Sequence, residues 1–422
     1  MASPAEGVLR YVDDHAADIV AELAELVRVP SVSGSDEEVA VQHLLAARMA
    51  EVGLDVDCWQ IPLDATLAEP DFPGVEVERR DAWGVVGSLP GRAGGPSLML
   101  NAHVDVVPTG DQASWGGERP FGGRVTASSV RGRGACDMKA GLVASLWVAR
   151  ACAALRVPLD GPLLIGTVIG EEDGGLGAWA TLARGHRGEA CVIPEPTAGA
   201  VVTANAGALT FRLDLSGRAA HAAYRDEGVS AVELFEELHA DLRELETDRQ
   251  AGADPRFAGA RYPYGLSIGK VSAGDWASSV PDRLVAEGRF GVQIGEPVET
   301  ARLVLEQRVA TFCAGHPWLA EHPARVTWTG GSFASGQLAA GAPLLDQLGT
   351  AAADSGSGVP EERAVAAGSD LRLYAAAGIP TLHYGPGDLR LAHGPSERVP
   401  VANLLAVTRA LALLAVRAVR PR

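Results

Sequence analysis

Hydrophobic and polar positions in the first half of the chain follow two alternating patterns. Residues 5–52 carry apolar side chains at helical spacing and predict two helices, one ending before Pro30 and one beginning after Ser35. Ser35 and Glu38 are spaced as a capping box for the second helix. Short apolar runs then alternate with helical stretches such as 138–155. The runs are 54–61, 83–89, 97–102, 162–169 and 190–193. Continuously apolar strands between helices predict an α/β sheet with helices on both faces.

The pattern changes near residue 206. Segments 208–217 and 283–295 alternate apolar and polar residues, as expected of strands with one face open to solvent. Helical periodicity appears at 230–246 and again at 299–312. The α/β pattern returns at about residue 330, with a strand in 379–384 and a final helix at 402–419. We therefore expect a large α/β/α domain with a mixed sheet, residues 1–205 and 329–422, that is interrupted by a smaller α+β domain, residues 206–328.

Composition narrows the possible functions. The chain has 422 residues, of which 47% are hydrophobic, and a net charge of −17. Such a charge disfavours binding to nucleic acid or to an anionic membrane, because no basic stripe is available for phosphates. The N-terminus lacks the features of a signal peptide and no apolar stretch reaches 18 residues, so we predict a cytoplasmic protein. Five cysteines without a CxxC pair are typical of reduced thiols.

Histidine and acidic side chains follow several of the predicted strands. In open α/β sheets, ligands bind beyond the carboxyl ends of the strands. The candidates at these positions are His103, Asp137, Glu171, Glu172, Glu195 and His393. Each alone would be an ordinary loop or surface residue. Together they indicate a metal site of a kind suited to zinc, or to cobalt or manganese.

The number of candidate ligands indicates two ions. A tetrahedral catalytic zinc needs three protein ligands and a water. If Asp137 bridges the ions, each ion has three protein ligands. The two predicted sets are His103, Asp137 and Glu195 for one ion and His393, Asp137 and Glu172 for the other, with a water between the ions.

Two further residues receive roles from their direction along extended backbone. Neighbouring residues of an extended segment point to opposite sides, so Glu172 can face an ion while Glu171 faces the water. Glu171 is therefore the predicted general base. Asp105 stands two residues after His103 and should point the same way. Its carboxylate is expected to accept the second imidazole N–H and to fix the ring.

Five short motifs in order resemble those of the co-catalytic zinc metallopeptidase/aminoacylase family. They are HVDVVP, GRGACDMKAG, GEEDGG, PEPT and LAHGPSE. The family includes acetylornithine deacetylase, succinyl-diaminopimelate desuccinylase, glutamate carboxypeptidase and aminoacylase-1. The resemblance covers nearly the whole chain. It implies that 1–205 and 329–422 form a catalytic domain with two zinc ions, and that 206–328 is an inserted lid through which the chain forms a homodimer.

The resemblance also implies roles that spacing alone does not. His221, in SGRAAHAAY, matches a lid histidine that stabilises the oxyanion from the partner subunit. Arg289 matches an arginine that meets a substrate carboxylate, and Ser369 and Asp370 lie in a loop that resembles the family's Gly-Thr-Asp loop near the substrate. The chain departs from many relatives at Ser279, where they carry asparagine.

These observations predict a two-zinc hydrolase that cleaves the amide bond of an N-acyl amino acid, with cobalt or manganese as possible substitutes. A carboxypeptidase or dipeptidase of the same family is the first alternative, and a carbamoyl-amide hydrolase is the second. From other classes, a non-catalytic metal-dependent binding protein would lack Glu171 or a ligand, and neither is missing. A serine hydrolase would need a G-x-S-x-G motif at the turn from a strand into a helix. The single match, GLSIG at 265–269, is not followed by a helical pattern.

Overall fold

A computed structural model describes residues 3–417 and divides into two compact units. Unit 1 contains residues up to Ala204, Gln337–Arg363 and the residues from Ser369 onward, and unit 2 contains Asn205–Gly336 and Ala364–Gly368. The boundary predicted between 328 and 329 falls inside strand β12 (Arg325–Phe333). This strand has an irregular register between Trp328 and Ser332, where two glycines interrupt the alternation that marked the other strands.

Unit 1 is built on a mixed sheet. Its strands, in spatial order, are β1 (Asp55–Gln60), β2 (Trp83–Leu89), β6 (Leu163–Val168), β3 (Leu98–His103), β7 (Ala190–Ile193), β15 (Thr381–His383), β8 (Val201–Asn205) and β13 (Gly336–Gln337), with β14 (Glu362–Val365) beside β8. The four central strands β6, β3, β7 and β15 run parallel, whereas β1, β2 and β8 pair antiparallel with their neighbours. The predicted α/β fold with a mixed sheet is therefore confirmed.

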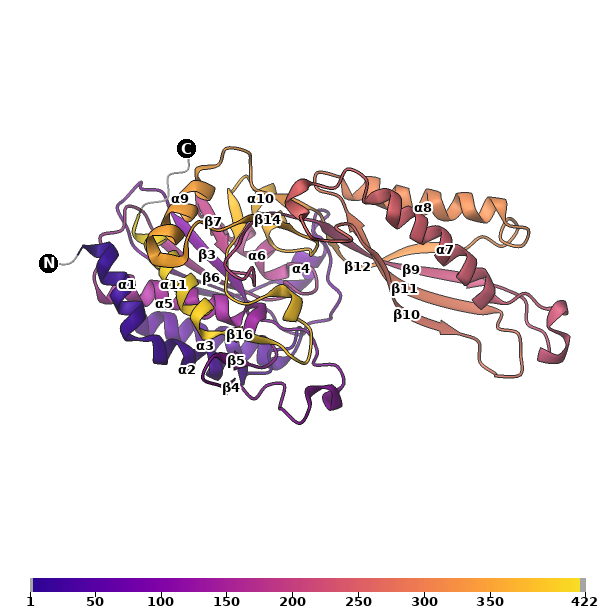
Figure 1. Ribbon diagram of the computed structural model, residues 1–422, viewed down its shortest axis with the longest axis horizontal. Helices are drawn as coiled ribbons and strands as arrows, with labels where there is room; N and C mark the ends of the chain where they lie inside the picture. The colour runs from indigo at the N-terminus through magenta and orange to yellow at the C-terminus, as the bar shows by residue number, and fades with distance from the viewer. Residues whose placement is uncertain (1–2, 418–422) are drawn as a thin grey trace. The chain divides into compact units, whose positions relative to one another are not determined.

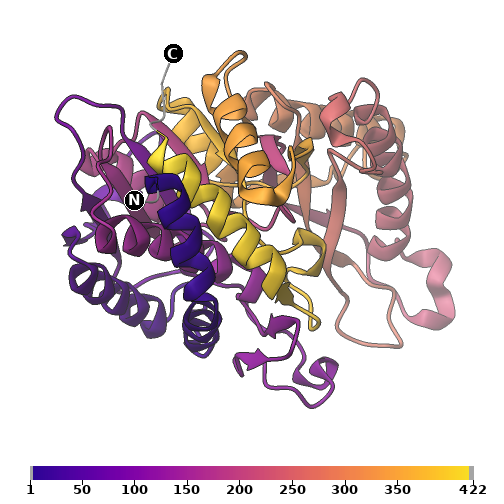
Figure 2. The ribbon, with the colours of Figure 1, turned by 60° about the vertical axis from the view of Figure 1, so that its left-hand side comes forward.

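Helices cover both faces of this sheet. The crossovers through α5 (Ala140–Ala154) and α6 (Leu176–Arg184) run in opposite directions along the sheet, so right-handed connections place them on opposite faces. Helix α11 packs against both α1 and α5, and Figures 1 and 2 show α1 and α11 side by side. The other helices of unit 1 are α1 (Pro4–Asp14), α2 (Ala16–Val27), α3 (Asp36–Val52), α4 (Leu63–Leu67), α9 (Pro343–Ala352), α10 (Leu371–Ala376) and α11 (Val401–Val416). A small separate sheet contains β4 (Arg124–Val125), β5 (Ser129–Arg131) and β16 (Arg398–Pro400).

The cap predicted at the start of the second helix forms only in part. Ser35 Oγ accepts the N–H of Glu38 at 3.3 Å, as a capping box requires. The Glu38 carboxylate, however, accepts from Gly34 N and from Arg79, so only half of the predicted box forms. A charged partner holds this carboxylate more strongly than the backbone N–H of Ser35 would. The end of the helix predicted at 402–419 lies partly outside the described residues.

Unit 2 contains a four-stranded antiparallel sheet and two helices. The strand order is β10 (Leu266–Ala273), β11 (Arg283–Val292), β9 (Gly207–Ser216) and β12. Alternate residues of β9, such as Phe211 and Leu213, are buried against α7 (Ala231–Arg249) and α8 (Val298–Gly315). The intervening residues face away from this core, which is the arrangement that alternation predicts.

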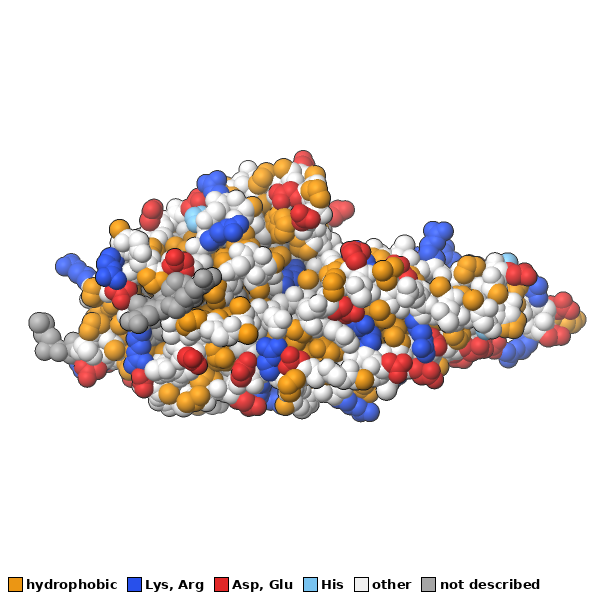
Figure 3. All heavy atoms as spheres, turned by 90° about the horizontal axis from the view of Figure 1, so that it is seen from above, with side chains coloured by type: hydrophobic (Ala, Val, Ile, Leu, Met, Phe, Trp, Pro, Cys, Tyr) orange, Lys and Arg blue, Asp and Glu red, His pale blue; other side chains and the backbone are white. Residues whose placement is uncertain are grey.

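Two surface properties bear on partners. Within residues 3–417, none of the helices combines the length and apolar character needed to cross a bilayer. On the face that Figure 3 displays, the described Lys and Arg side chains are scattered among Asp and Glu and do not gather into a stripe.

Candidate metal centre

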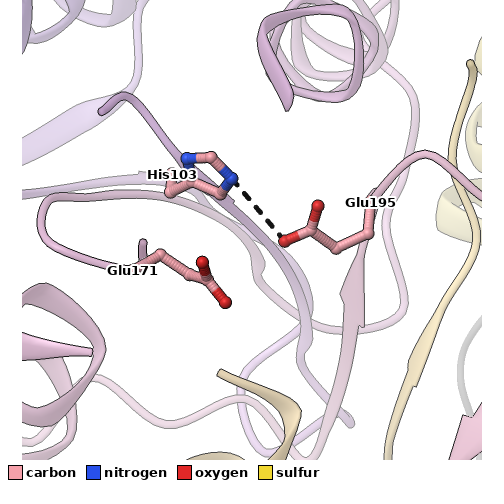
Figure 4. A group of neighbouring side chains, drawn as sticks. All are labelled: His103, Glu171 and Glu195. Carbon is pink, nitrogen blue, oxygen red and sulfur yellow. Dashed lines mark ion pairs between the residues drawn. The ribbon is translucent and has the colours of Figure 1, made fainter. Parts of the chain in front are cut away.

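The six predicted metal-site residues come together at one edge of the unit 1 sheet. His103 ends β3, Glu171 and Glu172 follow β6, and Glu195 follows β7. These three strands are parallel and adjacent, so the loops after them emerge at the same edge. Ligand atoms of His103, Glu171 and Glu195 lie within 4.8 Å of one another, and so do those of His103, Asp137 and Glu172. Figure 4 shows the first three side chains converging.

Asp137 lies between the two histidines. Its Oδ1 is 3.2 Å from His103 Nε2, and its Oδ2 is 3.4 Å from His393 Nε2. On the first side, Glu195 Oε1 lies 3.7 Å from His103 Nε2. On the second side, Glu172 lies 3.2 Å from His393 Nε2. Each of the two Asp137 oxygens thus faces a separate pair of potential metal ligands. This is the arrangement expected of a carboxylate that bridges two metal ions.

Against the effect of burial, the two histidines lower the pKa of Asp137, but the three glutamates of this centre lack sufficient positive charge from the protein. Burial raises the pKa of Glu171 well above its usual range, and repulsion from Asp370 and Glu195 raises it further. Burial is also the main reason why the pKa values of Glu172 and Glu195 are raised, and repulsion from the Asp137 carboxylate raises both further. Two bound cations would supply the missing charge, and imidazole nitrogens with carboxylate oxygens form a donor set suited to zinc. The residues present therefore fit a pair of divalent metal ions.

Asp105 does not act on His103 in the predicted way. His103 Nδ1 donates to the backbone carbonyl of Asp105 at 2.8 Å, whereas the Asp105 carboxylate is 3.7 Å away. The carboxylate accepts the backbone N–H groups of Glu171 (3.3 Å) and Glu172 (3.2 Å) and the Ser33 hydroxyl (3.0 Å). β3 ends at His103, so the extended geometry behind the prediction does not continue to Asp105. Since a carbonyl only accepts, Nδ1 carries the proton and Nε2 keeps its lone pair for a metal.

Arg133 and Glu397 support the centre and were not predicted. One oxygen of Glu397 accepts the N–H groups of Cys136 (3.2 Å) and Asp137 (3.3 Å), and the other lies 2.5 Å from Arg133 Nη1. Arg133 Nη2 also donates to the carbonyl of His393 at 3.1 Å. This buried pair joins the loop of Asp137 to the loop of His393. Both residues lie within the motifs GRGACDMKAG and LAHGPSE, but a pairing across 264 positions leaves no signal in the sequence.

Ser369 and Asp370, predicted to contact substrate, are both buried in unit 1. The Ser369 hydroxyl lies 2.8 Å from His383 Nε2 and accepts the N–H of Leu371. Ser369 is thus engaged within the fold, and its role as a substrate contact stays a prediction. Asp370 is 1% exposed, and neither of its oxygens accepts a hydrogen bond from the described residues. Arg372 Nη1 lies 3.9 Å from Asp370 Oδ1. Burial raises the pKa of Asp370 to about 6.

His221 and Arg289 both belong to unit 2. His221 is exposed and precedes the 3-10 helix Ala222–Glu227, where its Nδ1 accepts the N–H of Ala223 at 3.1 Å. A neutral ring that accepts at Nδ1 carries its proton at Nε2. Arg289, also exposed, donates to the carbonyl of Ala366 at 3.1 Å.

Curated relatives match different lengths of the chain. A deformylase of N-formyl-4-amino-5-aminomethyl-2-methylpyrimidine from Halalkalibacterium halodurans is 25% identical over 96% of this chain and 95% of its own length. A succinyl-diaminopimelate desuccinylase from Methylobacterium sp. is 34% identical over 47% of this chain and 48% of its own length. The first similarity thus extends over almost the whole chain, and the second over about half.

A solved structure and a family model extend the comparison. A dinuclear metal-binding peptidase of the M20 family from Bacillus subtilis superposes with a TM-score of 0.62, at 18% identity, over 96% of this chain and 100% of its own. At that identity the likeness concerns the fold. The model of peptidase family M20/M25/M40 matches residues 99–417, which include the six residues of the candidate metal centre. The chain therefore belongs to peptidase family M20/M25/M40 and is a hydrolase of amide or peptide bonds.

Proposed function

We propose that the chain uses two zinc ions to hydrolyse the amide bond of an N-acyl amino acid, with cobalt or manganese as substitutes. The observation that supports this most strongly is Asp137, whose two oxygens face His103 and His393 separately. His103, Asp137 and Glu195 would hold one ion, and His393, Asp137 and Glu172 would hold the other. Glu171 also lies close to His103 and Glu195, and we assign it the role of base and not that of a ligand.

The residues of the centre would divide the reaction among them. When bound, two divalent ions polarise the acyl carbonyl and lower the pKa of water toward about 7. Glu171 would take a proton from the attacking water and return it to the nitrogen as the C–N bond breaks, giving a carboxylic acid and a free amine. The Asp105 carboxylate holds the backbone N–H of Glu171, and so restrains the base while the proton moves.

The nature of the substrate is proposed from the relatives. One relative is named for removal of a formyl group and another for removal of a succinyl group, so both release an acyl group from an amine nitrogen. We therefore place N-acyl amino acids first. A peptide or dipeptide substrate is the second candidate, because the solved relative is described as a peptidase. Arg289, Ser369 and Asp370 are the proposed substrate contacts, with Arg289 placed to meet a carboxylate.

A direct test is an assay of metal-replete protein against N-formyl, N-acetyl and N-succinyl amino acids and dipeptides. We expect activity with zinc or cobalt, its loss on chelation, and its return when the metal is restored. Elemental analysis should give two ions per chain. One ion or fewer in fully active protein would contradict the shared role of Asp137. Tight metal binding without turnover on any amide would favour the binding-protein alternative.

We further propose that unit 2 is a lid and a dimerisation unit, and that His221 stabilises the oxyanion. Its Nε2–H is the donor that this role needs. An oxyanion donor typically lowers the barrier by about 3–4 kcal/mol. His221→Ala should therefore reduce turnover by about 10²–10³-fold with metal content unchanged. His322→Ala, which removes a histidine packed edge-on against Trp318, is the matched control and should stay near the wild-type rate.

Mixing inactive chains tests whether His221 acts on the partner subunit. His221→Ala and Glu171→Gln chains are mixed under conditions of confirmed subunit exchange. If the histidine acts in trans, each mixed dimer holds one complete site and part of the activity returns. No recovery, or a fully active monomer by analytical ultracentrifugation, would exclude action in trans.

A further inference from the structure

A buried ion-pair cluster adjoins the loop that carries Glu171 and Glu172. Arg79 Nε lies 2.9 Å from Glu38 Oε2, and Arg79 Nη2 lies 3.0 Å from Glu38 Oε1. The same guanidinium also binds both oxygens of Asp173, each at 2.8 Å. The side chains of Arg79, Glu38 and Asp173 are 2%, 1% and 4% exposed. Two buried carboxylates therefore share one cation, and each is held by a pair of hydrogen bonds.

The cluster also holds the acidic loop at two points, once through the backbone and once through a side chain. The N–H of Gly170 donates to Glu38 at 3.2 Å. The Asp173 carboxylate, besides binding Arg79, accepts the N–H of Val77 at 3.0 Å. Gly170 has a φ of +65°, and a Cβ at this position would lie 3.1 Å from Arg79 Nη2. Residue 173 is thus bonded to Arg79 directly and residue 170 through Glu38, and the two glutamates of the metal centre lie between them in the chain.

We propose that Arg79 is a positioning residue for the hydrolysis, because it holds the Glu38 and Asp173 carboxylates, which restrain the loop on both sides of Glu171 and Glu172, and so sets the direction of the Glu171 carboxylate. This inference rests on the proposed function. The competing role for Arg79 is stability alone, in which it only neutralises two buried acids. The two roles differ in which substitutions restore turnover.

The first measurement compares full-length Arg79→Met with wild type, both loaded with zinc. We expect kcat to fall by about 10–100-fold, as for other groups that orient a metal centre, while KM and metal content stay near wild type. Hydrogen–deuterium exchange should become faster in peptides covering 168–176. This exchange reports on the loop whether or not the chain turns over a substrate.

The second measurement separates positioning from charge balance. The variant Arg79→Met/Glu38→Gln/Asp173→Asn removes the cation together with both acids. If Arg79 positions the loop, the triple variant regains thermal stability but not kcat. Arg79→Lys keeps the charge but cannot form either two-pronged pair, so it should fold and still lose turnover. If Arg79→Met does not fold, Arg79→Lys replaces it in both measurements.

Arg249→Met is the matched control. Arg249 is 7% exposed and bonded to Glu296, which is 11% exposed, so this variant also loses a buried ion pair. It should lower Tm without lowering kcat. Wild-type kcat in the triple variant, or unchanged exchange at 168–176 in Arg79→Met, would overturn the proposal. Wild-type protein that cleaves no amide would instead contradict the proposed function, and the exchange result would still decide the role of Arg79.

Discussion

Replacing Glu171 with glutamine is expected to lower turnover by about 10²–10⁴-fold while metal content stays at the wild-type value. The amide keeps the size of the side chain but cannot accept a proton from water. The loss corresponds to about 3–5 kcal/mol of barrier. Binding of substrate needs no proton transfer, so KM should change far less than kcat. Steady-state kinetics and elemental analysis of the same preparation give both values.

Glu172→Gln is the matched comparison, since the two positions are adjacent and the chemical change is identical. Glu172 lies 3.2 Å from His393 Nε2, so this variant should lose one ion and with it activity. Excess zinc should restore part of the activity of Glu172→Gln and none of that of Glu171→Gln. Equal loss of metal in both variants, or near-normal turnover in Glu171→Gln, would reverse these assignments.

Replacing Asp137 with alanine is expected to remove both ions, because each is proposed to use one of its oxygens. Glu195→Ala should remove only the ion beside His103. Loss of both ions removes carbonyl polarisation and water activation together, so turnover should fall by at least about 10⁴-fold. Metal content after gel filtration, with isothermal titration of the chelated protein, measures the number of sites that remain.

Asp57→Ala provides the control for Asp137→Ala. Asp57 pairs with Arg184 and His186 near the surface of unit 1, so its loss also removes an aspartate ion pair. Both ions should stay bound in this variant. One ion retained at wild-type affinity in Asp137→Ala would show that Asp137 does not bridge.

Periodicity predicted the main elements of the fold because the pattern of burial repeats along each of them. The apolar runs at 83–89 and 190–193 became β2 and β7, and the alternating segment at 208–217 became β9. Short or glycine-containing strands such as β13 and β12 were missed. In these segments too few side chains pack on one face for a period to appear.

The candidate metal ligands could be predicted because they directly follow strands. The carboxyl ends of parallel strands lie at the same edge of a sheet. The supporting contacts could not be predicted. Arg79 meets Glu38 and Asp173 from a segment without regular structure, and Glu397 meets Asp137 from the far end of the chain. The direction of the Asp105 carboxylate depends on the residue at which β3 ends. Sequence propensities do not locate the end of a strand to within one residue.

The order of the segments in unit 1 has a consequence for synthesis on the ribosome. Strand β15, at residues 381–383, lies between β7 and β8, and α11 packs on α1 and α5. The central sheet therefore stays open, with apolar α5 lacking its cover, until almost the whole chain has been translated. All four strands of the unit 2 sheet, in contrast, are present once Phe333 has been added. The sheet of the inserted unit is thus the first that can form in full, and the nascent N-terminal half is the part of the chain that a chaperone would need to protect.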